Sequence, residues 1–352
     1  MKKNFLYVLG IAAMLASCSN GELVDQKDGQ VSTPDMPFDG KIALKTSGIT
    51  VSQTRAAIEK WEDTPIRVWG VDKNGTGWNT ETSSLFPAPN YYANAKVDVN
   101  GNVVFDNNDV YFYPLNSDVN FSFYSCSPQP ARTTVTSSSI IAAYNITGYD
   151  DILWGEAEAA NIQNGGTFAG YNARYFRKGG ATPMLGFKHL LTQLRFKAIK
   201  GSEGEVIGNS VVPVSVKNIS VVSVSQANLV VGGANKGSLT GSGDDKDIPV
   251  YFGANEPYGV SVAPTDTGAH AGTALVLPAQ IGSYKVKVTL AAMVNGKERV
   301  QTNEITITNP DGAFEAGKIY SVNLTIYGLR MVDLDATLEQ WKDGGAIDQE
   351  VN

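Results

Sequence analysis

The residue types and spacings that could carry out chemistry are scarce in this chain. A glycine-rich stretch at 312–318 matches the first seven positions of the phosphate-binding pattern G-x-x-x-x-G-K-[ST]. The next residue is Ile319, so the hydroxyl that would bind magnesium is missing, and a strand pattern follows where a helix should begin. We therefore expect Gly317 and Lys318 to form a turn that leads into a strand, and we predict no nucleotide site.

Nucleophilic and metal-binding residues form no recognisable constellation. Apart from Cys18 the only cysteine is Cys126, and the alternation of 121–126 predicts a small apolar strand residue there. Two isolated histidines, His189 and His270, cannot make a His-rich metal site, and no G-x-S-x-G or H-E-x-x-H motif occurs. We expect His189 to be a hydrogen-bonded structural residue. The sequence predicts neither an enzyme nor a cofactor or metal.

Acidic and aromatic clusters leave two binding hypotheses open. Carboxylates at 106–109, 150–151 and 244–247 could contribute to a calcium site, but none has the spacing of an EF-hand, and solvated loops are favoured. Aromatic residues could form a sugar-stacking platform, although core packing explains such residues more often. These aromatic residues are Trp61, Trp69, Trp78, Tyr91, Tyr92 and Trp154.

The overall composition points to an extracellular, β-rich protein. The 352 residues include 36 glycines and only 18% charged residues, which is below the roughly 25% of average globular chains. The formal net charge of −7 argues against nucleic acid as a partner, because phosphate binding needs a basic face. The hydrophobic fraction of 42% is enough for a folded core.

The amino terminus reads as a targeting segment. Two lysines precede an apolar run over 5–16, which is too short to cross a membrane as a helix. The run closes on Leu-Ala-Ser-Cys at 15–18, which resembles a bacterial lipobox. We predict a lipoprotein signal peptide at 1–17, lipidation of Cys18 and a polar, flexible tether at 18–39. An ordinary signal peptide with an incidental cysteine is the alternative.

From residue 40 onward the chain predicts strands. Short segments with period-two alternation are separated by turn signals, as at 72–75, 100–102 and 294–297. The pattern is interrupted around 176–183, which suggests a domain boundary, with one domain at 40–182 and another at 183–342. The predicted strands include 41–46, 65–71, 96–99, 102–105, 193–198, 217–224, 284–290, 304–308, 319–326 and 332–336.

Several stretches, taken in chain order, resemble the fimbrillins of Bacteroidales, the subunits of type V pili. The lipobox and tether are followed by a first strand and a loop that ends Gln-Thr-Arg-Ala at 53–56. Individually the stretches are weak, but together they span nearly the whole chain. The further stretches are the strand pair at 109–124, the Phe-Lys-His segment at 185–196, and the segments at 274–280, 314–324 and 338–345.

The resemblance implies two tandem β-sandwich domains, Greek-key-like and transthyretin-like, in a structural subunit of a fimbria. In that family an Arg-specific or trypsin-like protease cuts the loop after the first strand, and the carboxy-terminal segment of a neighbouring subunit fills the vacated groove. The matching cut here lies between Arg55 and Ala56, and Ile42 and Leu44 are the groove-filling side chains of the first strand, 41–46. An ordinary surface arginine is the alternative for Arg55.

The donor segment would come from the carboxy terminus. Residues 332–338 alternate and are interpreted as the last strand of the second domain, which leaves the tail 343–352 with Ile347 and Val351. This tail is short, so stalk, tip and accessory roles all stay open. The alternative function is a surface-exposed outer-membrane lipoprotein that binds a glycan or host ligand without polymerising.

Partners and location follow from the same resemblance. We expect other fimbrial subunits in a homo- or hetero-polymer, the outer membrane through the lipid on Cys18, and a host or glycan ligand for adhesion. The precursor would be an outer-membrane lipoprotein that is exported to the cell surface and incorporated into a fimbrium.

Overall fold

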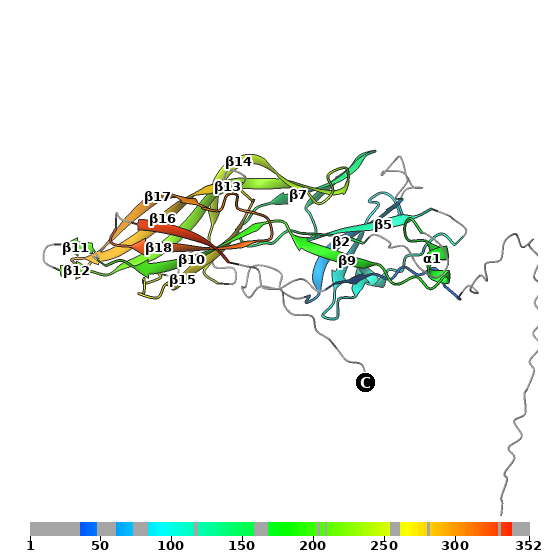
Figure 1. The fold of residues 1–352 in the computed structure, drawn as a ribbon, viewed down its shortest axis with the longest axis horizontal. Coiled ribbons are helices and arrows are strands. Elements are labelled where there is room, and N and C mark those ends of the chain that lie inside the picture. The colour runs from blue at the N-terminus through cyan, green and yellow to red at the C-terminus, as the bar shows by residue number, and fades with distance from the viewer. Residues whose placement is uncertain are drawn as a thin grey trace, which may run out of the picture.

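The described part of the chain folds mainly into β-strands, in an elongated body (Figure 1). The predicted all-β, sandwich-like fold is confirmed. The computed structural model describes residues 36–47, 61–72, 84–115, 119–157, 168–202, 205–207, 210–253, 261–279, 282–329 and 332–339. The predicted signal peptide and most of the tether lie outside these residues, as do Cys18, Arg55, Ala56, Ile347 and Val351.

A seven-stranded sheet forms the amino-terminal end of the body, in the order β1-β9-β8-β5-β2-β3-β4. Its neighbours are antiparallel except for β1 and β9, which run parallel. The short helix α1 (Ala173–Arg177) lies at the far end of this sheet (Figure 1). The strands are β1 (Lys45–Thr46), β2 (Thr64–Asp72), β3 (Ala93–Val97), β4 (Val103–Phe105), β5 (Phe121–Ser127), β8 (Leu153–Ala157) and β9 (Met184–His189), with a 3-10 turn at Asp106–Asn108 after β4.

A six-stranded sheet runs along the body in the path β17-β16-β13-β7-β6, with β14 paired to β13. The β16–β17 hairpin turns at Asn295 and Gly296, which have φ of 51° and 72°, so the turn predicted at 294–297 is confirmed. These strands are β6 (Arg132–Val135), β7 (Ser139–Asn145), β13 (Val214–Gly233), β14 (Leu239–Pro249), β16 (Ser283–Val294) and β17 (Lys297–Thr308).

The carboxy-terminal half is completed by a four-stranded sheet in the order β15-β10-β18-β19. The strand predicted at 319–326 has the same bounds in the structure, and the one predicted at 193–198 lies within β10. A small hairpin of β11 (Glu205–Ile207) and β12 (Ser210–Val212) lies at the opposite end of the body from α1 (Figure 1). The sheet consists of β10 (Thr192–Lys200), β15 (Ala269–Val276), β18 (Ile319–Ile326) and β19 (Val332–Glu339).

Strand β5 is buried on both faces and separates two hydrophobic cores. Phe121 and Phe123 belong to one core, while Tyr124 and Cys126 belong to the other. This is the alternation that the sequence predicts, and Cys126 is a buried strand residue as expected. Burial raises the pKa of its thiol to about 12.

Hydrogen bonding crosses the predicted domain boundary at 182/183 in both directions. Strand β9 follows the boundary in sequence, yet it pairs with β8 and β1 of the amino-terminal sheet. Strand β7 precedes the boundary, yet it pairs with the second half of the long strand β13.

Among the residues that the structure describes, no helix is long and apolar enough to cross a membrane.

Candidate functional site

The segment 40–47 lies beside β4 and the chain that follows it. The Ile42 N–H donates to the carbonyl oxygen of Tyr111 at 2.8 Å, and the Leu44 carbonyl accepts a hydrogen bond from the N–H of Val103 at 3.0 Å. Val103 is the first residue of β4, which is the last strand in the sheet order. The segment is therefore hydrogen-bonded to one end of the seven-stranded sheet.

The same segment is also bonded to the other end of that sheet. The Lys45 N–H donates to the carbonyl oxygen of Pro183 at 3.0 Å, and the Ser47 N–H donates to that of Leu185 at 3.2 Å. Pro183 immediately precedes β9 and Leu185 is the second residue of that strand. The segment, which includes β1 itself, thus bridges β9 and β4, and without it both of these strands would have an open edge.

Side chains of the segment alternate strictly between core and solvent. Ile42 is 3% exposed and Leu44 2%, and Thr46 is also buried, while Lys41, Ala43 and Lys45 are exposed. The burial predicted for Ile42 and Leu44 is therefore observed. The strand predicted at 41–46 is shorter than expected, because only Lys45–Thr46 forms a regular ladder and Lys41 forms a single bridge to Phe112. The segment changes its hydrogen-bonding partner along its length, which interrupts the ladder.

Ile42 and Leu44 pack into a core that is rich in aromatic rings. In it, Phe86 meets Phe105 edge-on, with ring centroids 5.9 Å apart. Burying one Leu or Ile side chain contributes about 1.5–3 kcal/mol, so the two together hold the segment with several kcal/mol. Burial also raises the pKa of Tyr113 in this core.

This arrangement can serve as a site for strand replacement. Main-chain hydrogen bonds on both sides do not depend on side-chain identity, while the alternate apolar side chains select for a matching pattern. Removal of the segment would leave two unpaired strand edges above an aromatic core, and exposed edges of that kind readily pair with another chain. Strand β19, interpreted from sequence as the last strand of the second domain, pairs with β18 from Ile326↔Val332 to Ile319↔Glu339, so that interpretation is confirmed.

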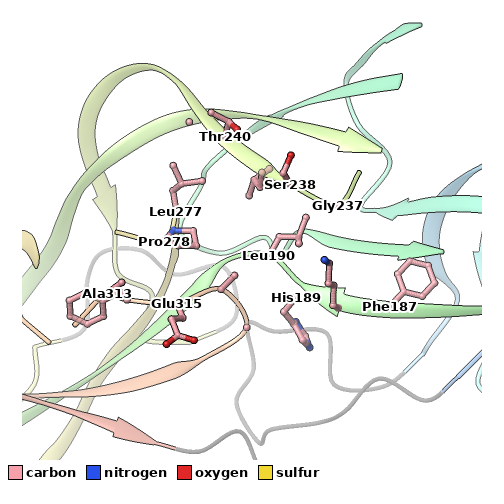
Figure 2. A pocket seen from close by; sticks show the side chains of 16 residues that line it. Phe187, His189, Leu190, Gly237, Ser238, Thr240, Leu277, Pro278, Ala313 and Glu315 are labelled. Atoms are coloured by element: carbon pink, nitrogen blue, oxygen red, sulfur yellow. The ribbon is translucent and has the colours of Figure 1, made fainter. Parts of the chain in front are cut away.

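A cavity of about 890 Å³ lies at the junction of the two halves (Figure 2). Leu190 lines it from the turn between β9 and β10, Leu277 and Pro278 from the end of β15, and Glu315 from the loop before β18. Three of the stretches that resemble the fimbrillins, 185–196, 274–280 and 314–324, therefore meet at this cavity. Gly317, with φ of 70°, lies in the turn before β18, so the turn predicted at Gly317 and Lys318 is confirmed.

His189, beside this cavity, is held by a carboxylate. Its Nδ1 lies 2.5 Å from Oδ2 of Asp151, and the side chains are 8% and 0% exposed. The prediction of a hydrogen-bonded structural histidine is confirmed. The prediction that 150–151 is a solvated loop is wrong for Asp151. Its carboxylate is buried, where it is hydrogen-bonded to His189.

The other acidic clusters form no metal site among the described residues. Residues 106–109 lie in and just after the 3-10 turn and are exposed or half-buried. The cluster at 244–247 is exposed as expected, but it lies within strand β14 and not in a loop, because its backbone pairs with β13.

The sugar-stacking platform considered from sequence does not form as a set. Trp61, Trp69 and Trp154 are at most 6% exposed and pack in the cores, and Trp78 lies outside the described residues. Trp154 also donates its indole N–H to the carbonyl oxygen of Val231 at 2.9 Å. Only Tyr91 and Tyr92 of the original set are half-buried and line a cavity.

Sequence reasoning missed one functional candidate beside these tyrosines, Arg67. This arginine lies in β2 and is 8% exposed. The signal was present in the alternation of 65–71, which places position 67 on the same face as the buried Trp69. A charged residue on the inward face of a strand is uncommon, because an ion is costly to bury.

Comparison with family models identifies one family. A family model described as fimbrillin-like matches residues 54–341. No curated protein sequence matches the chain at a significant level.

Among solved structures, a candidate cell adhesion protein from Bacteroides uniformis is 16% identical, covers 87% of this chain and 100% of its own, and has a TM-score of 0.51. A fimbrial protein from Bacteroides vulgatus is 12% identical over 86% of this chain and 99% of its own, with a TM-score of 0.48. A fimbrial assembly protein from Parabacteroides distasonis is 12% identical over 87% of this chain and 100% of its own, with a TM-score of 0.42. At these identities, the first likeness concerns the fold alone.

Proposed function

This chain belongs to the fimbrillin-like family, and from that premise we propose that it is a structural subunit of a cell-surface fimbria, assembled by protease-triggered strand exchange and contributing to adhesion. The observation that carries the proposal is the segment 40–47. It is hydrogen-bonded on both sides and buries Ile42 and Leu44, so it can be exchanged for another strand of the same pattern.

Proteolysis is the proposed trigger. Hydrolysis of the peptide bond between Arg55 and Ala56 would leave the segment 40–47 attached only by noncovalent contacts. Its release would then depend on competition with a second strand, not on unfolding of the body. The chain between Ser47 and Trp61, which contains Arg55, is long enough at 13 residues to reach a protease active site.

The proposed replacement is the tail 343–352 of a neighbouring subunit. Ile347 and Val351 are four positions apart, so in an extended strand they face the same side, as Ile42 and Leu44 do. The tail thus offers two large apolar residues on one face, at a spacing of four positions where Ile42 and Leu44 are two positions apart. Stalk, tip and accessory roles are all compatible with this pairing.

Before assembly, the proposed precursor is held at the outer membrane by lipid on Cys18, with 18–39 as its tether. Other fimbrial subunits are the proposed partners on both sides, one giving its tail to the groove and one receiving the tail of this chain. Attachment through lipid and attachment through the polymer would then be alternatives for the same molecule, separated by the cut after Arg55.

The test is a brief digestion of the purified chain with an arginine-specific protease, beside an Arg55→Gln variant and an Arg299→Gln control. Arg299 is an exposed arginine on β17, away from the segment. We expect a stable product that begins at Ala56 and lacks 41–46, and that forms concentration-dependent polymers on size-exclusion chromatography. Arg55→Gln should prevent both effects and Arg299→Gln neither. A chain that is cut at this bond and stays monomeric would favour the non-polymerising surface lipoprotein.

A further inference from the structure

Arg67 carries a buried positive charge whose hydrogen-bond acceptors are all neutral. Its Nε donates to Oδ1 of Asn94 at 3.0 Å. Its Nη1 donates to the carbonyl oxygen of Pro130 at 3.3 Å and to Oγ1 of Thr133 at 3.0 Å. Within the described part of the chain, no carboxylate forms an ion pair with this guanidinium.

A buried ion without a counter-ion is unusual, because desolvation is costly unless an opposite charge compensates it. The Tyr92 ring lies 4.0 Å from the guanidinium carbon and offsets part of this cost through a cation–π contact. The neutral acceptors offset another part. None of them removes the positive charge, so the site is electrostatically complementary to an anion.

The guanidinium lines a cavity of about 540 Å³. This volume lies within the roughly 300–1,000 Å³ that is typical of small-molecule sites. The cavity is bounded by β2, by the residues that lead into β3 and by strand β6. Arg132 at the start of β6 adds a second, exposed guanidinium, and Tyr91, Tyr92 and Thr133 complete the polar and aromatic lining.

The lining restricts the chemistry of the ligand. A planar guanidinium fork matches a carboxylate, and two such forks can hold one carboxylate from two sides. Tyrosine rings offer apolar faces with a polar tip, and the Asn90 amide and Thr133 hydroxyl offer hydrogen bonds, a combination suited to a pyranose ring with its hydroxyl groups. The net charge of −7 repels polyanions, which favours a ligand with a single charge.

We propose that this cavity binds a sugar with one carboxylate, a uronic acid or a sialic acid. Arg67 and Arg132 hold the carboxylate, and Tyr91 and Tyr92 lie against the ring. The site goes beyond the proposed fimbrial role and does not depend on strand exchange. A failed binding test would therefore leave that role standing, and a failed polymerisation test would leave this site standing.

The test is a calorimetric titration of the full chain with four probes. These are the methyl glycoside of glucuronic acid, the methyl glycoside of N-acetylneuraminic acid, neutral methyl glucoside, and acetate. We expect one acidic glycoside or both to bind, and the neutral glycoside to bind at least about 10-fold more weakly, since a charged hydrogen bond is lost. Whichever acidic glycoside binds shows whether the ligand is a uronic acid or a sialic acid. Equal binding of the neutral glycoside, no binding of either acidic one, or equally tight binding of acetate would overturn the proposal.

Variants locate the binding. Arg132→Gln should weaken binding of the acidic glycoside roughly 10-fold. Arg299→Gln should leave this binding unchanged, because Arg299 is an exposed arginine on β17, at the opposite end of the six-stranded sheet from β6. Arg67→Gln should abolish binding. Because Arg67 is buried and that variant can lose the fold, Tyr91→Asn provides an independent check, since Tyr91 has φ of 58° and asparagine tolerates that conformation. Unchanged affinity in both Arg132→Gln and Tyr91→Asn would place binding elsewhere and refute the site.

Discussion

Leu44→Ala should loosen the first segment in a way that a matched substitution in the other core does not. Leu44 is 2% exposed, and removing a buried leucine side chain costs about 2–5 kcal/mol. A cost of about 3 kcal/mol would raise the opening equilibrium of the segment roughly 150-fold. The amides of Ile42, Lys45 and Ser47, which donate to backbone carbonyls of neighbouring segments, should exchange with solvent faster by that factor.

The matched control is Leu290→Ala in β16, a leucine that is 0% exposed in the other core. This substitution lowers the global stability by a similar amount but touches nothing around the segment. If 40–47 opens as a separate unit, its amides should exchange at the wild-type rate in Leu290→Ala. Hydrogen exchange followed by NMR measures the rate at each of these amides directly. If the amides of the segment exchange equally faster in both variants, the segment opens only when the whole molecule unfolds. That result would refute a releasable strand.

Three further predictions concern the body of the protein. Gly148→Ala should lower the free energy of unfolding by about 3 kcal/mol in urea denaturation, because φ is 85° and a Cβ would lie 2.3 Å from a backbone oxygen. Gly296→Ala, with φ of 72° and open space, should cost only about 1 kcal/mol, and equal losses would contradict the steric argument. Cys126, with its pKa raised to about 12 by burial, is protonated at pH 8 and should resist thiol reagents until urea unfolds the chain, so rapid labelling of the folded protein would disprove its burial. Asp151→Ala removes the hydrogen bond to His189 and should cost about 1–3 kcal/mol, measured as a lower urea midpoint, whereas an unchanged midpoint would show that the pair contributes nothing.

Local alternation was sufficient to predict much of the fold. Strand β18 has its predicted bounds, and the two faces of β5 separate as the pattern indicates. Ile42 and Leu44 are buried for the same reason. A period of two is a property of a few consecutive residues, so it can be recognised without knowledge of the rest of the chain.

Pairing between distant segments could not be predicted in this way. The parallel contact of β1 with β9 joins residues about 139 positions apart, and nothing local distinguishes β9 from a strand of the second half. Asp151 was expected in solvent because its partner His189 is 38 positions away in the sequence. Arg67 was visible as a charge on an inward face, but its neutral acceptors come from two other segments, strand β3 and residues 130–133.

The most direct test of the fimbrial account is the intact mass and amino-terminal sequence of the protein from outer-membrane and sheared-surface fractions of its native host. The account predicts a chain that begins at Ala56 in the sheared fraction, which would mean that the first strand has been expelled. A chain that begins at lipidated Cys18 and is confined to the membrane fraction would contradict a polymerising subunit.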